Sequence, residues 1–216
     1  GLTTFTQDLD ENYTDFYYRW LNDFVNQLSL QDINIVGHSL GARIATVYAA
    51  NSGETVKSIV AITPAYSPSL KGLVFIESAI LKMLATRYGK MLDREVLKLF
   101  LHEMLLSKQR DTLTFLDFAI EEVIRDQSPL NMKGVLEALK WFQSERFAFE
   151  NIRVLSDRIP VTILCGQKDI YCSNRELLDI VGSKLKLEII KRSGHLLPLE
   201  HPKICSNRIL STVYSN

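Results

Sequence analysis

A serine, an aspartate and a histidine stand where each could serve one reaction. Ser39 is the central residue of Gly37-His38-Ser39-Leu40-Gly41, which matches the pattern G-x-S-x-G. A serine hydroxyl is a weak nucleophile at neutral pH, so it needs a histidine as base and an acid that orients this histidine. Asp169 and His195 are the candidates for these two parts, and they follow Ser39 in that order. The three side chains together indicate acyl transfer through a covalent serine intermediate.

The residues around Ser39 predict a tight turn from a strand into a helix. A short β-branched run at 33–36 precedes the motif, and a pattern of small residues at 40–50 follows it. Such a turn strains the nucleophile and exposes it above the sheet, and we expect glycine on both sides to leave room for strand and helix. The N–H of Leu40, at the start of the helix, is the candidate donor to an oxyanion.

Asp169 and His195 each come directly after a predicted strand, at 161–165 and 187–190 respectively. The carboxyl ends of parallel strands meet at one edge of a sheet, and functional residues of α/β folds gather there. We therefore expect both side chains beside Ser39. Asp157 is the nearest rival acid, but it precedes its strand and is expected at the opposite edge.

The remaining elements predict an α/β core interrupted by helices. A strand at 56–62 completes a strand-helix-strand unit with the run at 33–36, which implies a parallel sheet. Helical spacing predicts the other core helices at 14–28, 175–185 and 202–213. From 66 to 150 helical periodicity dominates and β-branched runs vanish. We predict a core of residues 1–65 and 151–216 and an all-helical cap of residues 66–150.

Composition describes an ordinary globular protein. The 216 residues are 46% hydrophobic and 23% charged, with 25 basic and 25 acidic residues, so there is no electrostatic case for nucleic acid as a partner. No apolar run is long enough for a membrane span. Cys165, Cys172 and Cys205 are odd in number and lack metal-ligand spacing, which argues against a disulfide scaffold or a zinc site. We expect a reducing, cytoplasmic location and a reaction that needs no cofactor.

These motifs resemble those of the α/β-hydrolase superfamily. The likeness rests on the elbow at 37–41, on Gly166-x-x-Asp169, and on Gly194-His195 followed by Glu200-His201-Pro202. It implies a mainly parallel sheet, with Ser39 as nucleophile, His195 as general base and then acid, and Asp169 as its orienting partner. It also implies that residues 66–150 form a cap, which resembles the V-shaped caps of esterases.

The start of the chain departs from this resemblance. The family's first strands, and the loop that supplies a second oxyanion N–H, normally precede the elbow by more residues than stand here before Ser39. We expect the N-terminal strands to be missing, so that the run at 33–36 presents an apolar edge which an N-terminal segment or a second chain completes. Loss of one oxyanion donor typically costs about 3–4 kcal/mol of transition-state stabilisation.

The favoured function is hydrolysis of a small-molecule carboxylic ester or thioester by the three residues. His38 and Leu196, which flank Ser39 and His195, are candidates for the substrate pocket. Two alternatives stay open. The same triad can hydrolyse a carbon–carbon bond, and a hydrolase-like chain can be catalytically silent and only bind a ligand or a partner.

Overall fold

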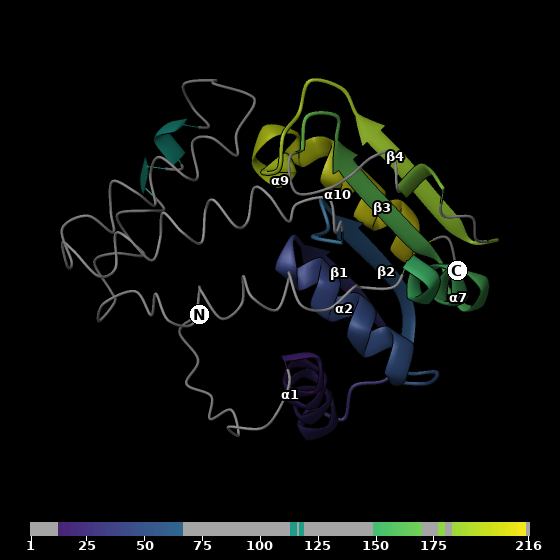
Figure 1. Cartoon of the computed structure of the whole chain (residues 1–216). Coiled ribbons are helices and arrows are strands. Elements are labelled where there is room, and N and C mark those ends of the chain that lie inside the picture. The colour runs from purple at the N-terminus through teal and green to yellow at the C-terminus, as the bar shows by residue number, and fades with distance from the viewer. Residues whose placement is uncertain are drawn as a thin grey trace.

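Within the described residues, four parallel strands form one sheet. The computed structural model describes residues 13–66, 113–115, 117–118, 149–169, 177–179 and 183–214. The strands lie in the order β1 (Ile33–His38), β2 (Val56–Ile62), β3 (Val161–Gly166) and β4 (Leu185–Ile190), as Figure 1 shows. Each neighbouring pair is parallel. The predicted α/β class with a parallel sheet is confirmed.

Helices pack on both faces of this sheet (Figure 1). On one face, α2 (Leu40–Asn51) contacts β1 and β2, and α7 (Phe149–Arg158) contacts β3 and β4. Outside them, α1 (Tyr13–Gln27) packs against α2. On the other face, α10 (Pro202–Val213) contacts β2 and β3, and the short α9 (Leu197–Glu200) packs against α10.

Alternation along the central strands divides the core into two layers. In β2, Ile59 and Ala61 join the cluster under α2 and α7, whereas Val60 and Ile62 join the cluster under α9 and α10. Successive side chains of a strand point to opposite faces, so a strand covered on both sides is apolar throughout. This is why residues 59–62 of β2 and residues 163–165 of β3 are consecutive apolar residues in the sequence.

The sequence predicts most of these elements within a few residues, with one clear error. The predicted helix at 175–185 runs too far, because Leu185 is the first residue of β4 and pairs with Val161. The backbone carbonyl of Lys184 already accepts from the N–H of Val161 in β3, at 3.1 Å, so the chain has joined the sheet by then. Neither α7 nor α9 was predicted as a separate helix.

The cap prediction lies almost wholly outside the described residues. Within 66–150, residues 113–115 and 117–118 are described away from the core, and they are helical. At the other end of this region, α7 begins at Phe149, before the predicted return to the core at 151. The boundaries of the cap therefore stay a prediction.

The first strand ends the sheet within the described residues. There β1 pairs with β2 alone, and Val36 is 44% exposed. The segment or second chain expected to complete this edge stays a prediction. Across the described ranges, no helix combines the length and the apolar character that crossing a membrane requires.

Strand β1 and helix α2 approach each other closely where the chain turns between them. A Cβ atom on Gly37 would lie 2.4 Å from the carbonyl oxygen of Gly41 and 2.5 Å from the nitrogen of Ala42. A Cβ atom on Gly41 would meet no heavy atom of the described residues within 4 Å. The expectation that both glycines are needed for space is thus wrong for Gly41 among these residues, and it is right for Gly37.

Gly37→Ala should therefore destabilise the fold, while Gly41→Ala serves as its matched control. The first change overlaps backbone atoms that cannot rotate away, so we expect a loss of ~1–3 kcal/mol or more in the free energy of unfolding. The second replaces a helical glycine and should stabilise by up to about 1 kcal/mol. Urea denaturation of both variants measures the difference, and equal stabilities would contradict the steric argument.

Candidate active site

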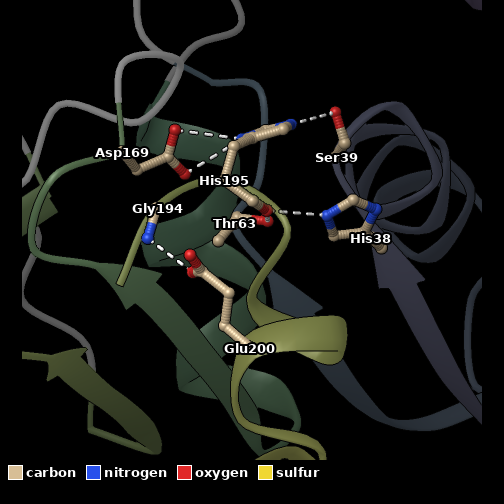
Figure 2. Close-up of polar contacts among 7 residues, drawn as sticks. All are labelled: His38, Ser39, Thr63, Asp169, Gly194, His195 and Glu200. Carbon is tan, nitrogen blue, oxygen red and sulfur yellow. Dashed lines mark hydrogen bonds and ion pairs between the residues drawn. The ribbon is translucent and has the colours of Figure 1, made fainter. Parts of the chain in front are cut away.

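The described edge of the sheet brings Ser39, Asp169 and His195 together. Ser39 follows β1 directly, Asp169 lies in the turn after β3, and His195 lies in the loop after β4. His195 Nε2 is 2.8 Å from Ser39 Oγ, and His195 Nδ1 is 2.9 and 3.1 Å from the two carboxylate oxygens of Asp169 (Figure 2). His195 therefore lies within hydrogen-bonding distance of both other residues predicted from the sequence, Ser39 on one side and Asp169 on the other.

The hydrogen bonds of His195 fix the positions of its protons. An ionised carboxylate can only accept, so Nδ1 must carry the hydrogen that faces Asp169. In the neutral imidazole, Nε2 is then the acceptor and takes the hydroxyl hydrogen of Ser39. The side chains of His195 and Asp169 are 4% and 0% exposed, so water competes little for these bonds. This arrangement can move a proton from the serine to the histidine.

Ser39 is held in a conformation that few residues adopt. Its φ is 53° and its ψ is −116°, which is costly for a residue with a Cβ. The backbone N–H of Ser39 donates to the carbonyl of Ile62 at 3.0 Å, so the strained residue is tied to the end of β2. Leu40 is the first residue of α2, and the first N–H groups of a helix have no acceptor within the helix. A negative charge at Ser39 would face this helix end.

The turns that carry Asp169 and His195 are packed against each other. A Cβ atom on Gly166 would lie 2.1 Å from the carbonyl oxygen of Gly194, so only glycine permits this approach. The N–H of Lys168 donates to the carbonyl of Ser193 at 3.0 Å. The spacing Gly166-x-x-Asp169 thereby has a physical reason, because the glycine lets the acid turn reach the histidine loop.

The buried carboxylate of Glu200 also holds the loop that carries His195. Glu200, at the end of α9, accepts a hydrogen bond from the backbone N–H of Gly194 at 2.6 Å (Figure 2). The side chain of Ser193 donates to the carbonyl of Ile190 at 2.7 Å. Glu200 belongs to the Glu200-His201-Pro202 motif that resembles the family, but no role was predicted for it. The structure shows that it holds the residue before His195.

His38 and Leu196 were predicted to line a substrate pocket. His38 Nε2 lies 2.9 Å from the backbone carbonyl oxygen of His195, and the two rings are 5.3 Å apart. A carbonyl only accepts, so Nε2 of His38 carries a hydrogen. Leu196 is half-buried and precedes α9. The structure thus gives His38 a contact with the histidine loop, and both pocket assignments stay predictions.

Thr63, for which no role was predicted from the sequence, also contacts the loop that carries His195. Its hydroxyl donates to the same carbonyl of His195 at 2.8 Å (Figure 2). The one signal that could have found it is position, because Thr63 directly follows β2 at the edge where the neighbouring strands deliver Ser39 and Asp169.

Other candidate residues lie away from this centre. Asp157, in the last turn of α7, accepts a hydrogen bond from the N–H of Ser183 at 3.0 Å, and this bond lowers the pKa of its carboxyl. It lies at the opposite edge, as expected. Cys172 and residues 1–12 are outside the described residues, so the expected lack of a second oxyanion donor stays a prediction. In the described ranges no group of three or more potential ligands is arranged to hold a metal ion.

Comparison with known proteins gives a consistent family. The family described as alpha/beta hydrolase fold matches residues 1–202. Carboxylesterase YbfK of Bacillus subtilis (strain 168) is 21% identical over 214 residues, which are 93% of this chain and 64% of that relative. The chain thus spans less than two thirds of the length of this relative.

Solved structures share the fold. The esterase EaEST from Exiguobacterium antarcticum has a TM-score of 0.73 at 19% identity. The match covers 93% of this chain and 73% of the esterase chain. A bromoperoxidase from Bacillus anthracis has a TM-score of 0.74 at 18% identity. The match covers 98% of this chain and 77% of the bromoperoxidase chain. At such identities the likeness establishes a common fold.

The position of His38 makes stability depend on pH. Burial is the main cause that lowers the pKa of His38 below its usual value. As pH falls through about 6.5, the unfolded chain gains a proton at His38 that the folded protein does not yet bind, so the free energy of unfolding must fall. Above that pH both states are neutral and the effect is absent.

His38→Gln replaces the imidazole donor with an amide donor and removes the group that titrates. We expect the free energy of unfolding of the wild type to fall more steeply than that of this variant between about pH 7 and about pH 5. Urea denaturation at a series of pH values measures both slopes. Parallel slopes would mean that burial of His38 does not influence its protonation.

Proposed function

Because the chain belongs to the alpha/beta hydrolase fold family, we propose that it is a serine hydrolase that cleaves a carboxylic ester or thioester. The observation that carries this proposal is the continuous line of hydrogen bonds from Asp169 through His195 to Ser39. The carboxylesterase among its relatives supports an ester as substrate.

The proposed reaction proceeds through an acyl-enzyme. Ser39 Oγ attacks the acyl carbon while His195 Nε2 takes its proton, and Asp169 stabilises the imidazolium that forms. The oxyanion of the tetrahedral intermediate faces the N-terminus of α2, where Leu40 offers its N–H. His195 then protonates the leaving alcohol or thiol. In the second half, His195 takes a proton from a water molecule, which attacks the acyl carbon. The acid is then released as His195 passes the proton to Ser39 Oγ.

Ser39→Ala should abolish this chemistry. The wild-type chain should hydrolyse p-nitrophenyl esters with an initial burst as the acyl-enzyme forms, and the acyl length it prefers reports the pocket. A fluorophosphonate probe should add its mass at Ser39 in the wild type and not in Ser39→Ala. Turnover and labelling that persist in the variant would contradict the assignment of the nucleophile. Absence of both in the wild type would favour a silent, ligand-binding chain.

Asp169→Asn tests the orienting acid. An asparagine amide in this place can donate to Nδ1 and favours the tautomer that cannot accept the serine proton, so we expect kcat to fall by about 10⁴-fold. Asp157→Asn is the matched control, because it makes the same change at the opposite edge of the sheet. The control should retain the kcat of the wild type. Equal losses in both variants would remove Asp169 from the mechanism.

A further inference from the structure

We propose that Thr63 is a positioning residue, whose buried hydroxyl holds the backbone carbonyl of His195 and thereby sets the imidazole at its distance from Ser39. The inference rests on the proposed function, in which His195 is the base. Thr63 does not touch the reacting atoms, so its effect must pass through His195.

The contact is direct and shielded from water. Thr63 is 0% exposed, and its Oγ1 donates to the carbonyl oxygen of His195 at 2.8 Å. His38 Nε2 reaches the same oxygen at 2.9 Å from the end of β1 (Figure 2). A carbonyl oxygen has two lone pairs, so both bonds can form together. The loop that carries the base is therefore held from the ends of two adjacent strands.

The backbone of Thr63 indicates that its side chain is required there. Its φ is 41°, a value that glycine tolerates and that is rare for a β-branched residue. Its N–H donates to the carbonyl of Leu164 at 2.6 Å, which continues the pairing of β2 with β3 and holds the residue in this conformation. Backbone strain of this kind is concentrated at functional sites. Glycine would relieve the strain and would lack the hydroxyl.

The same short segment is bonded to the nucleophile. The carbonyl of Ile62 accepts from the N–H of Ser39 at 3.0 Å, and the N–H of Ala65 donates to the carbonyl of Ser39 at 3.4 Å. Residues 62–65 thus contact the backbone of Ser39 on one side and, through Thr63, the backbone of His195 on the other. This segment is a fixed connection between nucleophile and base.

Thr63→Val tests the hydroxyl alone, because valine keeps the shape and the β-branching, and therefore the backbone strain. Loss of the bond should let the histidine loop shift, and displacement of a catalytic group typically costs about 10- to 100-fold. We expect kcat for p-nitrophenyl esters, and the rate of fluorophosphonate labelling at Ser39, to fall by about this factor, with KM unchanged. Thr63→Ser retains the donor and should recover most of both.

Thr162→Val is the matched control. Thr162 is a buried threonine near the start of β3, at the opposite end of the strand from Asp169. Its hydroxyl is hydrogen-bonded to the hydroxyl of Thr212 at 2.8 Å. It should lose stability in a thermal melt, as Thr63→Val does, and retain the kcat of the wild type. If the two valine variants have equal kcat, or if Thr63→Ser is as slow as Thr63→Val, the inference is overturned.

A second measurement separates this inference from the proposed function. The chain has 4 histidines, so ¹⁵N spectra of the ring nitrogens can be assigned individually. In the wild type His195 should show one tautomer, protonated at Nδ1, and in Thr63→Val these signals should shift or average. A wild type without turnover or labelling defeats the proposed function. Unchanged His195 signals in Thr63→Val defeat the positioning role, whether or not the enzyme turns over.

Discussion

The parallel register of the four strands is the constraint on which the site depends. Because all strands run in one direction, their carboxyl ends meet at a single edge, and each end delivers one residue to it. These residues are Ser39 after β1, Thr63 after β2, Asp169 after β3 and His195 after β4. A slip of one residue along a strand displaces its end by about 3.3 Å. That displacement exceeds the length of the hydrogen bonds between His195 and its two partners, so the register decides whether Ser39, Asp169 and His195 can meet.

The buried core is what keeps this register while the strand ends are strained. Ser39 and Thr63 both have positive φ, which costs of order 1–3 kcal/mol each. Strands β2 and β3 are covered on both faces, and Ile59 and Ile163 are among their fully buried side chains. Each such side chain contributes roughly 1.5–3 kcal/mol on burial. The strain is therefore concentrated at the edge, where it serves the geometry of the site, and the centre of the sheet offsets it.

Much of this arrangement could be predicted from the sequence, because the physical signals are local. Runs of β-branched residues indicated β1, β2 and β3, and the position of each acid or base directly after a strand placed it at the correct edge. The failures also have local causes. Leu185 ends a stretch with helical spacing and begins a strand, and the sequence around it is compatible with both a helix and a strand. Helix α7 was not predicted. All but its first two residues follow position 150, in the part assigned to the core, where no element was assigned before the strand at 161–165.

The support of His195 could not be predicted in the same way, because its partners are backbone groups. Thr63, His38 and Glu200 act through a carbonyl or an N–H, and every residue except proline offers both, so no residue type or spacing identifies the pairing. What the sequence does provide is position. Because Ser39, Asp169 and His195 follow β1, β3 and β4, the first polar residue after β2 is expected to lie among them. A buried hydroxyl there has to find an acceptor, and the loop that carries His195 supplies it. Parallel topology thus identifies positioning residues that motifs leave out.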